Sequence, residues 1–190
     1  MPYNFQNTIN EFIAREEYQN AYYLTKQEII NNEKNILDTE KEMSNINFSD
    51  LKENYIKILD LYEAMLYRKK LTLIRVLYYL LKVNSNNFSL FISYLKELKS
   101  FCDEVNYFED LNLDNGWLHK NLPIPISQAA NSIISSKTES VERLNRLFQL
   151  IQAFPSIKRS IHFPSMCSGF ECGLNHNKEI LSEFVIWKQS

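Results

Sequence analysis

The strongest hydrophobic pattern lies in the middle of the chain. From Tyr55 to Leu80, large apolar residues recur in alternating steps of four and three, and only Lys69 interrupts the series. Such spacing places the apolar side chains on one side of an α-helix. Ser49 is a candidate N-cap for this segment. The pattern therefore predicts a helix over residues 50–83. A second apolar row widens its expected buried side: Ile58, Met65 and Tyr79.

A narrower stripe runs along residues 5–47. Apolar side chains recur there every seven residues, at Tyr22, Ile29, Ile36 and Met43, with Tyr23, Ile30 and Leu37 beside them. Seven residues are nearly two helical turns, so each set lies along one side. Polar residues fill the remaining positions. This region predicts one long polar helix or two, whose stripe fits a single shallow contact on the protein itself or on a partner.

Turn-forming residues divide the rest of the chain. Residues 84–87 read Asn-Ser-Asn-Asn, which favours a turn and predicts a helical hairpin with the next helix, over residues 88–108. Residues 109–126 predict a loop, because Pro123 and Pro125 favour an extended path. The apolar residues of this loop are expected to lie across the bundle. Further helices are predicted over residues 127–135, 138–154 and 178–188.

Together these elements predict an all-α fold, an irregular antiparallel helical bundle. Residues 1–48 are expected to form a long N-terminal helical arm, and residues 49–190 a bundle domain continuous with it. A short loop containing Cys and His precedes the C-terminal helix. The chain has 190 residues and only three glycines, which agrees with a helical fold. Glycine-rich phosphate-binding loops are excluded by the same count.

No targeting or membrane-spanning segment is expected. The longest apolar run, residues 71–81, contains Arg75 and is shorter than the roughly 20 residues that a membrane-spanning helix needs. Residues 1–4 open a polar stretch without the features of a secretory leader. We therefore expect a cytoplasmic protein with no membrane partner. Three cysteines do not indicate a disulfide framework.

Most of the Cys and His residues gather before the last helix. His162, Cys167, Cys172 and His176 follow the spacing H-x4-C-x4-C-x3-H, and Gly169 and Gly173 fall among them. Thiolate and imidazole ligands suit tetrahedral zinc. The cluster therefore presents a candidate site for structural zinc. The alternatives are cysteines that serve as small core residues with surface histidines, or a disulfide or redox pair, because zinc cysteines are more often separated by two residues.

The charge is distributed unevenly along the chain. Residues 1–50 contain four basic and nine acidic residues, whereas residues 51–100 contain nine basic and four acidic ones. The two segments are therefore expected to pair. A basic group on this helix has two interpretations: contact with nucleic-acid phosphates, or salt bridges within the protein or to a partner. The group comprises Arg68, Lys69, Lys70 and Arg75. Lys69 favours pairing with an acidic group of residues 1–50, since it interrupts an apolar series.

The sequence favours a non-enzymatic protein-interaction role. It contains no recognisable catalytic motif, and its aromatic content is 13%, in residue types that are enriched in interfaces. We expect an accessory subunit of a larger complex, with a protein partner or a second copy of the chain. Asn, Ile and Lys are abundant, which indicates an AT-rich coding bias, and such a bias is compatible with a bacterial defence or mobile-element system. The alternatives are a nucleic-acid-binding helical module and an enzyme whose active site is dispersed along the sequence.

Overall fold

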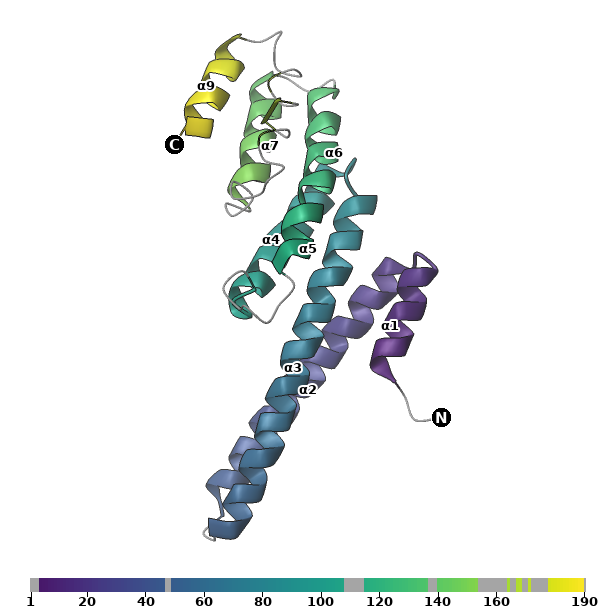
Figure 1. Ribbon diagram of the computed structural model, residues 1–190, viewed down its shortest axis with the longest axis vertical. Coiled ribbons are helices and arrows are strands. Elements are labelled where there is room, and N and C mark those ends of the chain that lie inside the picture. The colour runs from purple at the N-terminus through teal and green to yellow at the C-terminus, as the bar shows by residue number, and fades with distance from the viewer. Residues whose placement is uncertain are drawn as a thin grey trace. The chain divides into compact units, whose positions relative to one another are not determined.

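The protein is described by a computed structural model that covers residues 4–46, 49–107, 115–136, 140–153, 164, 167, 168, 171 and 178–189. Within these ranges every helix or strand is an α-helix, which confirms the all-α fold class (Figure 1). The chain divides into two compact units, residues 1–76 and 77–190, and the boundary falls inside one helix. The expected division after residue 48 stays a prediction.

The N-terminal unit contains three helices. They are α1 (Phe5–Ala14), α2 (Tyr18–Ser44) and the greater part of α3 (Ser49–Val83). Figure 1 shows α1 lying against the first half of α2. The helices α2 and α3 run antiparallel. Glu28, in the first half of α2, contacts Lys69 in the second half of α3, whereas Glu42, near the end of α2, contacts Tyr55 in the first half of α3. The described part of this region, residues 5–44, forms two helices, which is the second of the two predicted possibilities.

Residue Glu16 explains why α1 and α2 are separate. Its φ of 60° lies in the left-handed region. The Glu17 N–H donates to the Phe12 carbonyl at 2.8 Å, and the Glu16 N–H to the Ile13 carbonyl at 3.1 Å. These two bonds form a Schellman motif, which closes a helix and usually has glycine at this position. A chain with three glycines uses glutamate here.

Replacing Glu16 with glycine should stabilise the N-terminal unit. The Cβ atom of a non-glycine residue costs about 1 kcal/mol in the left-handed region, and glycine avoids this cost. We expect Glu16→Gly to raise the free energy of unfolding by about 0.5–1 kcal/mol, measured by urea denaturation. Arg15→Gly is the matched control, because Arg15 has a φ of −92° and glycine brings no conformational gain there. Equal effects of the two variants would contradict this explanation.

The C-terminal unit contains the remaining helices. They are α4 (Phe88–Glu104), α5 (Asn115–Asn121), α6 (Pro123–Ile134), α7 (Ser140–Gln152) and α9 (Lys178–Gln189), together with the end of α3. Its core includes Phe91, Leu95 and Leu98 of α4, each fully buried. Helix α4 ends before the predicted residue 108, because Asn106 adopts a φ of 48°. Its N–H donates to Asp103 while Tyr107 donates to Cys102, a second Schellman motif without glycine.

A buried thiol also belongs to this core. Cys102 on α4 is 1% exposed. Burial, together with the neighbouring Asp103, raises the pKa of the Cys102 thiol to about 12, although Lys99 opposes the shift. The thiol therefore stays protonated at neutral pH, and an uncharged thiol is a poor nucleophile. Cys102 acts as a small core residue.

The prediction of an extended loop up to residue 126 was wrong. Helix α5 covers residues 115–121, and α6 begins at Pro123. Pro123 and Pro125 lie in the first turn of α6, where backbone N–H groups have no acceptor within the helix and the fixed φ of proline suits helix initiation. The apolar residues of this segment divide, since Leu122 and Ile126 are buried while Ile124 is half exposed.

Candidate protein-interaction surface

The proposed zinc ligands lie mostly outside the described residues. This applies to His162, Cys172 and His176, whereas Cys167 is described and fully buried. Within the described ranges, no group of three or more His, Cys, Asp or Glu side chains is arranged to hold a metal ion. Because three of the four ligands are not among these residues, the zinc site stays a prediction.

The basic group of α3 does not form one surface. Arg68 and Arg75 are exposed and, seven residues apart, lie on the same side of the helix. Lys70 is half-buried, and its Nζ lies 4.0 Å from Glu33 Oε1 on α2. Lys69 is buried. The four residues that the sequence grouped by proximity therefore face different surroundings.

Lys69 forms a buried polar network with α2. Its Nζ lies 3.0 Å from Glu28 Oε2, 3.1 Å from the Glu28 carbonyl and 3.3 Å from Asn32 Oδ1. These three acceptors match the three N–H donors of an ammonium group. Asn32 in turn donates from Nδ2 to the Tyr62 carbonyl at 2.6 Å. The expected pairing between the acidic first segment and the basic second one is confirmed at Lys69.

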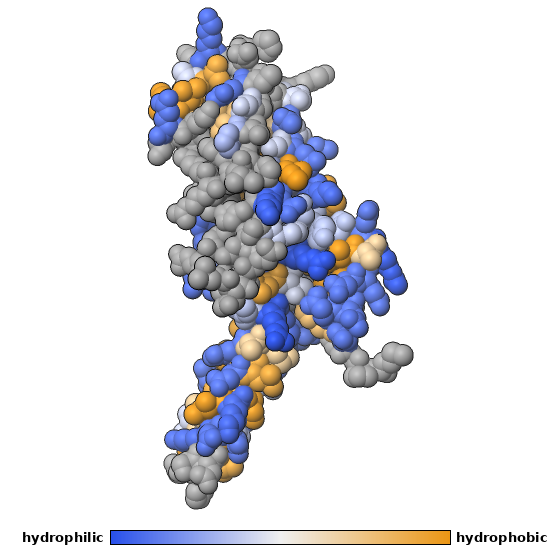
Figure 2. Space-filling view, viewed as in Figure 1, coloured by the Kyte–Doolittle hydropathy of each residue, from blue (hydrophilic) through white to orange (hydrophobic). Residues whose placement is uncertain are grey.

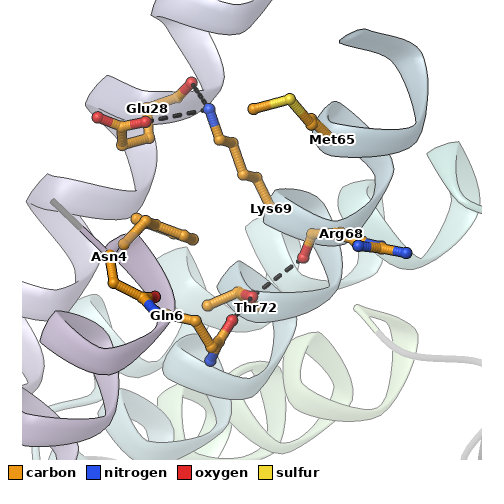
Figure 3. Close-up of a pocket in the computed structure, with 8 residues that line it drawn as sticks. Asn4, Gln6, Glu28, Met65, Arg68, Lys69 and Thr72 are labelled. Atoms are coloured by element: carbon orange, nitrogen blue, oxygen red, sulfur yellow. Dashed lines mark hydrogen bonds and ion pairs between the residues drawn. The ribbon is translucent and has the colours of Figure 1, made fainter. Parts of the chain in front are cut away.

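A hollow of about 600 Å³ lies beside this network, where the start of α1 meets the antiparallel pair of α2 and α3, here called the hairpin (Figure 3). In Figure 3 the Lys69 side chain extends across the hollow toward Glu28. Gln6 Oε1 lies 3.4 Å from Thr72 Oγ1, which connects α1 to α3. Glu28 neutralises Lys69, and Arg68 is the third charged residue of the lining. Its lining comprises Asn4, Phe5, Gln6, Glu28, Met65, Arg68, Lys69 and Thr72.

An exposed apolar row on α3 leads into the hollow. The row, here called the α3 row, comprises Leu51, Ile58, Leu61 and Met65, which are 38–60% exposed. Their spacing of seven, three and four places them on one side of α3, and Met65 itself lines the hollow. Figure 2 shows apolar residues among polar ones along the part of the hairpin away from α1. The prediction that Ile58 and Met65 widen the buried side was wrong.

A second exposed row lies on the other side of the hairpin. This α2 row comprises Tyr23, Ile30 and Leu37, each more than half exposed. Ile30 follows Glu28 by two residues, or about 200° around the helix, and Glu28 lines the hollow. The α2 row therefore faces away from the hollow. These residues belong to the apolar pattern of the sequence, but the burial of Ile29 shows that the neighbouring stripe, which contains Ile29, packs inside the protein.

Comparison with known proteins adds no functional information. No family model matches the chain, and no curated protein or solved structure matches it. Among the described helices, none combines the length and the apolar character needed to cross a membrane. The function is therefore inferred from the exposed surface of the hairpin.

Proposed function

We propose that this protein binds another protein through the α3 row, as an interaction or accessory subunit of a larger complex. The exposed α3 row and the hollow at its end support this function. Removing a large apolar side chain from water contributes about 1–2 kcal/mol. Four such side chains in one row, continued by a hollow that accepts an anchoring side chain, provide a surface of the kind that amphipathic helices recognise.

The surroundings of the row favour a helical partner with basic residues. Helix α1 lies at the far side of the hollow, with Phe5 in its lining, so a partner helix on the α3 row would continue the packing that α1 begins. Glu42 lies two heptads after Glu28 and therefore flanks the row on the α2 side. Residues 31–63 contain eight acidic and four basic residues. An amphipathic helix with Lys or Arg beside its apolar face complements this charge.

The nucleic-acid alternative has narrower support. The exposed cations on one side of α3 are Arg68, Arg75 and Lys82, spaced by seven residues, whereas Lys69 is neutralised by Glu28. Three phosphate contacts provide only part of the counterion release that drives nucleic-acid binding. The exposed apolar row therefore favours a protein partner.

The proposal is tested by comparing co-purification from the source cells. We expect a partner that accompanies the full chain in near-stoichiometric amount and is lost with Ile58→Asp or Leu61→Asp. Ile186→Asp on α9 is the matched control, since Ile186 is 68% exposed and lies far along the chain. Circular dichroism checks that every variant is folded. Retention of the partner by both α3 variants, or its equal loss with Ile186→Asp, would show that the α3 row does not bind it.

A further inference from the structure

The α3 row continues past Met65 into an exposed cation. Arg68 follows Leu61 by seven residues and Met65 by three, so it lies on the same side of α3 as the row. Arg68 is exposed, and it also lines the hollow. A partner helix on the α3 row therefore meets apolar side chains first and a guanidinium group at the end of the row.

Arg68 differs from the two cations that follow it, because both of those contact carboxylates of α2. The Lys69 ammonium lies 3.0 Å from Glu28. The Lys70 ammonium lies 4.0 Å from Glu33. Within the described ranges the Arg68 guanidinium has no ion pair. Figure 3 shows its side chain pointing away from Glu28 and from the residues of α1. Arg68 is therefore available to an anionic group of another molecule.

Helix α1 covers the row beyond Arg68. Thr72 follows Met65 by seven residues and is the next position of the row. It is buried, and its Oγ1 lies 3.4 Å from Gln6 Oε1 on α1. A partner on the α3 row can therefore extend as far as Arg68 before it meets α1. From Leu51 to Arg68 the open row is about 25 Å long, which about 17 residues of a partner helix would cover.

The charge of the hairpin changes sign along this open row. Residues 31–63 contain eight acidic and four basic residues, whereas residues 64–76 contain four basic residues and no acidic one. Two of these four, Lys69 and Lys70, contact α2, and Arg68 lies at the end of the open row. A complementary partner helix has basic residues at one end and a carboxylate at the other.

We infer that the partner helix carries an Asp or Glu that pairs with Arg68, one turn beyond the apolar side chains that cover the α3 row. This inference rests on the proposed function, because it names the chemistry of the partner that binds there. A guanidinium group can donate two N–H groups to the two oxygens of one carboxylate. The pair fixes the register of the partner along α3, since a shift by one helical turn moves the carboxylate about 5 Å from Arg68.

Charge reversal at Arg68 tests the inference, with the protein that co-purifies with the full chain as the probe. Arg68→Glu should weaken its binding by about tenfold, whereas Arg68→Lys should retain most of the affinity because it keeps the charge. Arg75→Glu is the matched control, since Arg75 is also exposed and lies beyond the position that α1 covers. Isothermal titration measures the affinities, and circular dichroism checks that each variant is folded. Equal losses with Arg68→Glu and Arg75→Glu would overturn the inference, because they would show a general attraction to positive charge.

Charge reversal in the partner identifies the residue that faces Arg68. Each Asp or Glu of its helix is replaced with Lys in turn, and one of these changes should restore binding to the Arg68→Glu variant. Recovery with none of them would overturn the pairing. Binding that is lost with Ile58→Asp and retained with Arg68→Glu would refute the pairing and leave the proposed function standing. Binding retained with Ile58→Asp, or the absence of a co-purifying partner, would refute both.

Discussion

Glu28→Gln should lower the free energy of unfolding by about 3 kcal/mol, because it leaves the Lys69 ammonium buried without an anionic partner. The Lys69 side chain is 10% exposed and that of Glu28 23%. The remaining acceptors, the Glu28 carbonyl and Asn32 Oδ1, are neutral. Replacing both ends, with Glu28→Gln and Lys69→Met together, should recover most of the loss, since no charge is then buried. Urea denaturation followed by circular dichroism measures both effects.

The exposed pair Lys57–Glu53 is the control. Its atoms are 2.8 Å apart, but its side chains are 67% and 70% exposed, so water replaces the interaction and Glu53→Gln should have little effect. The two substitutions are chemically identical, and only burial distinguishes them. A loss with Glu28→Gln no greater than that with Glu53→Gln would show that Lys69 reaches water in solution.

Phe91→Ala should destabilise the protein by about 4 kcal/mol. Phe91 is among the largest side chains that are fully buried, with 0% exposure on α4. Its truncation loses the transfer free energy of the ring and leaves a cavity that rigid neighbouring helices fill only partly. Phe91→Leu should cost less, because it retains much of the volume. Denaturant unfolding at constant pH measures the difference.

The adjacent residue Leu90 provides the matched control for Phe91. Leu90 is 43% exposed on the same helix, so Leu90→Ala removes an apolar side chain of similar size without opening a buried cavity. We expect a change within about 0.5 kcal/mol, as for most surface substitutions. If Leu90→Ala and Phe91→Ala had equal effects, the assignment of Phe91 to the core would be wrong.

The candidate site was only partly predictable from the sequence. Lys69 was identifiable because it interrupts an apolar series. The excess of acidic residues in residues 1–50 indicated that its partner lies in that segment. The partner Glu28 and the contribution of Asn32 depend on the register of α2 against α3, which the spacing of either helix alone does not specify. The hollow forms only where the start of α1 lies beside α2 and α3, and the contact of Gln6 with Thr72 joins residues 66 positions apart in the chain.

Local signals were sufficient for α3 and insufficient for α6. The alternating spacing over α3 repeats through many turns, and the helix runs from Ser49 to Val83, within one residue of its prediction. Helix α6 contains two prolines, and the effect of a proline depends on its position in a helix. They interrupt the interior of a helix but are tolerated in its first turn, and the residues after them did not reveal that the first turn begins at Pro123.

The sequence by itself determined that the chain is helical and which residues share a side of each helix, because both follow from local spacing and turn residues. The tertiary structure decided which side is covered. On α2 the stripe with Ile29 is buried and the neighbouring stripe with Ile30 is exposed, although the two have similar apolar character. On α3 the row with Ile58 is exposed although it adjoins the buried side. A helical pattern fixes relative directions around one axis, and only packing against a second helix selects the direction that faces inward.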